Sequence, residues 1–235
     1  MSEPSTAFIL FLVGLLVGFG FFKLAQRQIK VRCEALPQLA EDYNPAFLNQ
    51  RWVLPVWEVL FGGLFAASAL IGENWLQVLF FTVYISCAVN IAMVDIAIRR
   101  IPNELLLAVL IARIVYVVGN HFISGEAPKM LLQNAVLSVI GLVGGFIIYL
   151  IPSKFGIYIG SGDIKLSAVI GFAVGIISYF QAMAVMAVIM LAYLIILIVT
   201  KKGGRKSYAP MGPALAAGAL VTMFFPLFSS SVKLF

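Results

Sequence analysis

Two aspartates could do chemistry, because each lies at the end of a long apolar run. Asp95 occurs in AMVDIAIRRIPNELL and Asp163 in GIYIGSGDIKLSAVIG. Ionisable side chains at membrane depth are costly, which makes them functional candidates by default. In a close pair of carboxyl groups, one can activate water as a general base while the other, protonated, polarises a scissile carbonyl. The two residues therefore fit an aspartic protease.

The residues around each aspartate suit that chemistry. Gly160 and Gly162 carry no bulky side chain, so a substrate backbone could come close to Asp163. Pro102 disfavours helix at the residue before it, and Asn103 can cap the segment that follows. A short, stiff turn is therefore expected beside the first aspartate.

Structural roles are open alternatives for several of these residues. Asp163 could simply cap its helix, and Asp95 could form an ion pair with Arg99 one helical turn later. Glu58, in VLPVWEVLFGG, could be a structural hydrogen-bonding residue or a helper to the site. We slightly favour the structural role for Glu58.

Other polar residues are assigned no chemistry. We expect Arg113 to snorkel or to satisfy a buried acid, Glu104 to be a first-turn charge, and His121 to be incidental. Cys33 and Cys87 lie in different segments, so neither a disulfide framework nor a zinc cluster is expected.

The elements that must position the aspartates are membrane helices. Of the 235 residues, 62% are hydrophobic and 11% charged, and the apolar runs are continuous. Helices satisfy their own backbone groups in hydrocarbon, so we predict an all-α, polytopic membrane bundle. About eight spans are expected, at residues 7–25, 53–71, 75–97, 104–119, 130–152, 164–179, 181–200 and 212–229. The tight link near Tyr179 to Gln181 separates the sixth and seventh.

Basic residues predict the orientation, because Lys and Arg are retained in cytoplasmic loops. Alternate loops on one side hold 13 of the 16: Lys23, Arg27, Lys30, Arg32, Arg51, Arg99, Arg100, Lys154, Lys165, Lys201, Lys202, Arg205 and Lys206. Both termini should therefore lie outside, with both aspartates at the cytoplasmic face. The net charge of +6 is then a topology signal, and no nucleic-acid partner is expected.

The chain is expected to be a single membrane domain over residues 1–235. Its first apolar segment lacks a basic region before it and should remain as an anchor. Residues 26–52 form the longest predicted loop, which is too short for a core of its own.

At these residues the chain resembles the prepilin peptidases, or type IV leader peptidases. The family pattern D-x6-P-[DN] is matched by Asp95 through Pro102 and Asn103. The pattern G-x-G-D-x-K-L-x-A-x-x-G is matched by Gly160, Gly162, Asp163, Lys165, Leu166, Ala168 and Gly171. The stretches VGLLVGFGFFKLAQR, QRWVLPVWEVLFGG and YAPMGPALAAGAL are similar to further family segments, so most of the chain is covered.

The resemblance implies an aspartic endopeptidase of the bacterial inner membrane, with Asp95 and Asp163 as its catalytic pair. Its substrates would be type IV prepilins or type II secretion pseudopilins, cut at the cytoplasmic face, typically after a glycine. Many members also carry two CxxC pairs that bind zinc. These enzymes also methylate the new N-terminus, using S-adenosylmethionine. Here Cys33 stands alone in a short loop, so no metal is expected. Proteolysis needs no cofactor, and methylation is left open.

Two rival classes are considered. Presenilin-type proteases also use G-x-G-D, but they place a Y-D pair on the preceding helix, whereas Val94 precedes Asp95 here. A proton- or cation-coupled transporter using Asp95 and Asp163 would need an aqueous path to both membrane faces. The two aspartates are predicted at one face, and no inverted repeat is visible.

Overall fold

Every regular element in the described part of the chain is helical. The computed structural model describes residues 4–125, 127–156, 159–200 and 210–227. Its elements are α1 (Pro4–Ala35), α2 (Gln38–Asp42), the 3-10 helix η1 (Pro45–Asn49), α3 (Val53–Ile71), α4 (Trp75–Ile98), α5 (Asn103–Ser124), α6 (Pro128–Lys154), α7 (Ser161–Val199) and α8 (Met211–Phe224). All of these except α2, η1 and α8 are long and apolar enough to cross a membrane, which makes six candidate spans. The all-helical membrane bundle is confirmed, whereas the count of eight and the outward termini stay predictions.

The chain divides into two compact units. The first ends at Val136 and the second runs from Leu137 to Leu234, so α6 contributes to both. The single domain expected over residues 1–235 stays a prediction.

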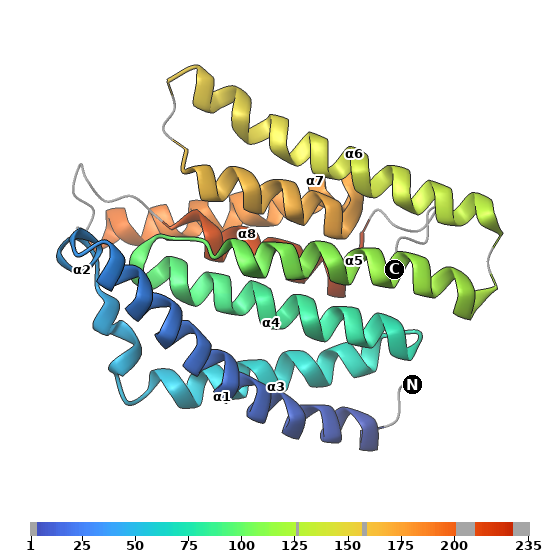
Figure 1. Ribbon diagram of the computed structural model, residues 1–235, viewed down its shortest axis with the longest axis horizontal. Helices are drawn as coiled ribbons and strands as arrows, with labels where there is room; N and C mark the ends of the chain where they lie inside the picture. Colours follow the sequence, from blue (N-terminus) through green and yellow to red (C-terminus); the bar gives the residue numbers. More distant parts are fainter. Residues whose placement is uncertain (1–3, 126, 157–158, 201–209, 228–235) are drawn as a thin grey trace. The chain divides into compact units, whose positions relative to one another are not determined.

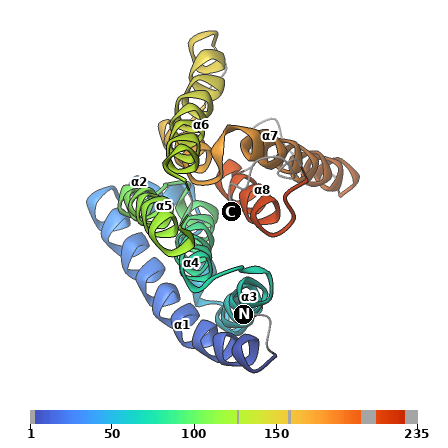
Figure 2. The same cartoon turned by 90° about the vertical axis from the view of Figure 1, so that its right-hand side faces the viewer.

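Helix α4 forms the centre of the first unit. It lies between α5 and α3 and also contacts α1 (Figures 1 and 2). The most apolar stretch of α4 is 72% buried, against 22–28% in α1, α3 and α5. The Asn74 side chain caps its start by accepting a 2.8 Å hydrogen bond from the Gln77 backbone N–H. Helix α4 is thus the enclosed element of this unit, and it carries Asp95.

Small residues bring α1 and α3 close together. A Cβ atom at Gly14 would lie 2.8 Å from the Gly62 Cα atom, and one at Gly18 would lie 3.2 Å from the Glu58 Cα atom. The pairing runs in opposite directions along the two helices, so they are antiparallel. Close backbone approach through small residues is a usual basis of helix association in membranes, where burial of apolar side chains gives little driving force.

The loop predicted at residues 26–52 is partly helical. Helix α1 continues to Ala35, beyond its predicted end at residue 25, because the polar residues that leave the membrane are still good helix formers. The chain then packs back onto the end of α4 through what we call the α4-end cluster. Its buried members are Phe22, Ala25, Ile29, Leu48, Val53, Met93, Val94, Ala97 and Ile98.

Helix α7, in the second unit, is broken at Gly175. This residue has φ 76° and ψ 161°, a conformation that essentially only glycine adopts. The link predicted near Tyr179 to Gln181 is therefore wrong, and the break divides α7 into an Asp163 segment (161–174) and a return segment (176–199). Figure 1 shows the ribbon of α7 turning back on itself.

Helix α8 packs against the return segment of α7, where a Cβ atom at Gly218 would run into the Ala182 carbonyl. With 14 residues, α8 is shorter than the span predicted at residues 212–229. The end of that predicted span, and the basic loop with Lys201, Lys202, Arg205 and Lys206, lie outside the described residues.

Candidate active site

Asp95 lies in the last turn of α4. The residue is 5% exposed, and its backbone carbonyl accepts a 2.9 Å hydrogen bond from the Arg99 N–H. Arg99 ends the helix in the left-handed conformation, with φ 49°. Its guanidinium carbon lies 5.4 Å from the centre of the Tyr43 ring, within the range of a cation–π contact. The first candidate carboxylate is therefore buried on a well-defined helix end.

The α4-end cluster fixes that helix end in place. Met93, Val94, Ala97 and Ile98 flank Asp95 along α4 and pack against residues of α1, η1 and α3. Trp57 and Leu54 of α3 pack against the same cluster. An apolar framework of this kind holds a helix rigidly, and a rigid element positions a functional side chain more precisely than a loop does.

The turn after Asp95 begins α5 in a different way from that predicted. Pro102 occupies the N-cap position with φ −68° and ψ 118°, and Asn103 is the first helical residue. The prediction that Asn103 caps this helix is therefore wrong. The stiff turn is present because proline fixes its own φ and cannot continue a preceding helix.

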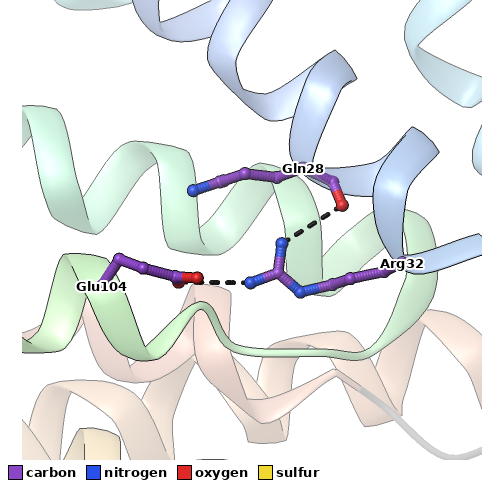
Figure 3. A network of polar contacts seen from close by, with 3 residues as sticks. All are labelled: Gln28, Arg32 and Glu104. Carbon is purple, nitrogen blue, oxygen red and sulfur yellow. Dashed lines mark hydrogen bonds and ion pairs between the residues drawn. The ribbon is translucent and has the colours of Figure 1, made fainter. Parts of the chain in front are cut away.

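An ion pair ties the start of α5 to α1. The Arg32 Nη2 atom lies 3.2 Å from Glu104 Oε2, and Arg32 Nη1 donates a 3.1 Å hydrogen bond to the Gln28 carbonyl (Figure 3). Glu104 does lie in the first turn, as predicted, and it also has this basic partner.

Asp163 lies in the first turn of α7. Gly160 occupies the N-cap position and Asp163 follows three residues later, so the alternative that Asp163 is the N-cap of this helix is wrong. A carboxylate in a first turn is favoured by the helix dipole. A Cβ atom at Gly160 would lie 3.0 Å from Asp163 Oδ2, so the carboxylate occupies the space that a side chain at this position would need.

The other candidates near Asp163 differ in exposure. Gly160, Gly162 and Asp163 are half-buried, whereas Lys165 is exposed. This end of the Asp163 segment is therefore only partly enclosed.

Glu58 lies at the seam between α1 and α3. It is half-buried, and its backbone faces Gly18. That position fits a structural role, and a role as helper to the site stays a prediction.

Arg113 does not snorkel. It is 0% exposed, and its guanidinium carbon lies 5.7 Å from the centre of the Phe80 ring and 5.5 Å from that of Tyr116. The two rings provide a cation–π environment between α4 and α5 in place of the membrane interface, and the alternative that Arg113 satisfies a buried acid stays a prediction.

The sequence-predicted residues fall into two sets. The first unit holds Asp95, Glu58, Pro102 and Asn103, and the second holds Asp163, Gly160, Gly162 and Lys165. The pairing of Asp95 with Asp163 stays a prediction.

Two residues of this region were missed from the sequence. The Ser167 and Tyr179 hydroxyls are 2.6 Å apart, one on each side of the Gly175 break. The available signal was that Ser167 lies one helical turn after Asp163.

The cysteines provide no metal cluster in the described part of the chain. Cys33 is half-buried, Cys87 is buried, and neither is in a disulfide. Among the described residues, no group of three or more His, Cys, Asp or Glu side chains could hold a metal ion.

Comparison with known proteins decides the family. The model of the type IV leader peptidase family matches residues 82–201, which include both aspartates and both motifs. The chain belongs to this family. It is also 27% identical, over 175 residues, to the prepilin leader peptidase/N-methyltransferase of Bacillus subtilis (strain 168). That alignment covers 74% of this chain and 66% of the relative, so the match spans slightly less than two thirds of the relative's length. No solved structure matches the chain.

Proposed function

We propose that this leader peptidase family member is an aspartic endopeptidase that removes the basic leader of type IV prepilins or type II secretion pseudopilins. One observation carries the proposal. The family match covers residues 82–201 and includes Asp95 and Asp163, each within its complete motif. The relative from Bacillus subtilis, by its name, acts as a prepilin leader peptidase.

The two carboxyl groups would divide the chemistry between them. One, ionised, takes a proton from water as the water oxygen attacks the scissile carbonyl. The other, protonated, donates a hydrogen bond to that carbonyl and then supplies the proton that the leaving amine needs. Two carboxyl groups close together favour this division, because both cannot readily be charged at once. The buried position of Asp95 and the half-buried position of Asp163 fit a site that limits access of bulk water.

We place this reaction at the cytoplasmic face of a bacterial inner membrane. The support is the distribution of Lys and Arg, because 13 of the 16 fall in the four predicted loops on the side where both aspartates are predicted to lie. A substrate with a basic leader and an apolar helix would obey the same rule, so its leader would remain on this side. The apolar helix of the substrate would then lie in the bilayer against the bundle.

Gly160, Gly162 and Lys165 are proposed to shape the approach to Asp163. The two glycines leave the start of the Asp163 segment free of bulk, so an extended substrate backbone can approach it. Lys165, which is exposed, is placed one half-turn from Asp163 on the same segment.

Methylation of the new N-terminus is not part of the proposal. S-adenosylmethionine carries a cationic sulfonium, a ribose and an adenine, so its site needs a carboxylate and converging hydrogen-bonding groups. Glu58 lies at the α1–α3 seam, Glu104 pairs with Arg32, and Glu73 precedes α4. No described residue is assigned to such a site, so methylation stays open and no step is assigned to this cofactor.

The test uses the full chain in membrane vesicles with a synthetic prepilin. The prepilin has a basic leader, a glycine before the cleaved bond and an apolar helix after it. We expect the leader to be released, with a single new N-terminus following the glycine in mass analysis. No cleavage of this substrate by the wild-type chain would overturn the proposal. Imposing a pH gradient on the same vesicles tests the transporter alternative, which no described contact favours.

A further inference from the structure

A chain of hydrogen bonds links three helical segments of the second unit. The Ser167 hydroxyl of the Asp163 segment donates a 2.9 Å bond to the Gly145 carbonyl of α6 and lies 2.6 Å from the Tyr179 hydroxyl of the return segment. Because the Ser167 proton goes to Gly145, Tyr179 is the donor of the second bond. Ser167 and Tyr179 are both 0% exposed, so neither bond competes with water.

This contact exists only because of the break at Gly175. Ser167 and Tyr179 are twelve residues apart. A straight helix would separate their backbones by about 18 Å, which two side chains cannot span. The Ser167–Tyr179 bond therefore fastens the Asp163 segment to the return segment across the turn and sets the angle between them.

Close packing against α6 restricts most movements of the Asp163 segment. The movement that remains is a change in its angle to the return segment. A Cβ atom at Gly145 would lie 3.2 Å from the Ala168 Cα atom, and one at Gly171 would run into the Gly141 carbonyl. These contacts hold the two backbones together along one line. They do not by themselves fix how the segment tilts about that line, whereas a hydrogen bond to the return segment does.

Asp163 lies one helical turn before Ser167, on the same face of the segment. The Tyr149 phenol, one helical turn after Gly145 on α6, donates a 3.2 Å hydrogen bond to the Met186 sulfur of the return segment. The carboxyl group and the hydrogen-bonded cluster therefore belong to the same small region.

We propose that Ser167 and Tyr179 are positioning residues that set the place of the Asp163 carboxyl. They act through the backbone of the Asp163 segment. This inference rests on the proposed peptidase function. Losing the bond lets the segment tilt, and a displacement of about 1 Å at a reacting group can cost on the order of 100-fold in rate. The rate of the chemical step should therefore fall while substrate binding is kept.

The kinetic test compares Tyr179→Phe and Ser167→Ala with Tyr193→Phe, a matched control on an exposed part of the same helix. Each protein is purified as the full chain, and kcat and KM are measured with the synthetic prepilin. We expect about a tenfold fall in kcat for both test variants, with KM within about twofold of wild type and no change for the control. The double variant should match Ser167→Ala, because that change already removes the bond to Tyr179 together with the bond to Gly145.

A second measurement is independent of activity. Spin labels are placed at Ser161→Cys and Leu191→Cys, both exposed, in a chain with Cys33 and Cys87 replaced by alanine. We expect Tyr179→Phe to shift or broaden the distance distribution between the labels. An unchanged kcat, additive effects in the double variant or an unchanged distribution would each overturn the inference. Lack of cleavage by the wild type would instead remove the proposed function, and the distance distribution would still decide whether the bond sets the tilt.

Discussion

Gly160 leaves the space that the Asp163 carboxylate occupies. A Cβ atom at Gly160 would lie 3.0 Å from Asp163 Oδ2, closer than an ordinary van der Waals contact. The first glycine of the G-x-G-D pattern therefore has a physical reason in this chain, since only a residue without a side chain lets the carboxylate sit where it does.

We expect Gly160→Ala to lower prepilin cleavage about tenfold with little loss of stability. The added methyl group displaces only the end of the Asp163 side chain, but a small displacement of a reacting group is costly. The measurement is kcat alongside a thermal unfolding curve in detergent. Gly63→Ala is the control, because a Cβ atom there meets nothing within 4 Å. Wild-type kcat in Gly160→Ala would show that the carboxylate position is not critical.

Asp95→Asn and Asp163→Asn should each abolish leader removal while the protein still inserts. An amide keeps the shape of the carboxyl group but can neither take a proton from water nor supply one to the leaving amine. Leader removal is followed by the change in size of the prepilin, and insertion by recovery of the variant from membranes. Normal processing by either variant would refute the two-carboxylate mechanism.

Both aspartates could be identified as candidates from the sequence, because acids are rare in apolar runs and are costly at membrane depth, and their catalytic pairing stays a prediction. Asp95 and Asp163 needed no knowledge of the fold. The break in α7 could not be placed, because Gly175 looks like the other glycines of an apolar stretch until its backbone conformation is known. The link was expected a few residues later, near Tyr179.

Contacts that depend on that break were equally hidden. In the sequence, Ser167 and Tyr179 resemble ordinary small and aromatic residues of a membrane helix, and only the fold-back brings their hydroxyls together.

The starts of α5 and α7 differ from the predicted ones for a local reason. Asn103 and Asp163 are both good cap residues, but Pro102 and Gly160 take the cap positions because their backbones are extended there.

The Arg32–Glu104 ion pair should contribute little to stability. The Arg32 and Glu104 side chains are 24% and 71% exposed, and ion pairs near water are typically worth about 0.2–1 kcal/mol. A double-mutant cycle with Arg32→Gln and Glu104→Gln, followed by thermal unfolding at low and high salt, checks this. We expect a coupling energy below about 1 kcal/mol that decreases with salt. Cleavage should be kept, and a large loss of kcat in Glu104→Gln would place Glu104 in the catalytic site.

Gly171→Ala should destabilise the second unit. A Cβ atom at Gly171 would collide with the backbone carbonyl of Gly141, and a backbone atom cannot move aside as a side chain can. Helices α6 and α7 must then separate, and overpacking of this kind typically costs about 1–3 kcal/mol. Gly63→Ala is again the control, and it should be neutral or slightly stabilising because alanine is the better helix former. Unfolding in detergent, followed by the loss of helical circular dichroism, shows whether each variant is more or less stable than wild type. Equal stability of Gly171→Ala and wild type would mean that the two helices are not in backbone contact.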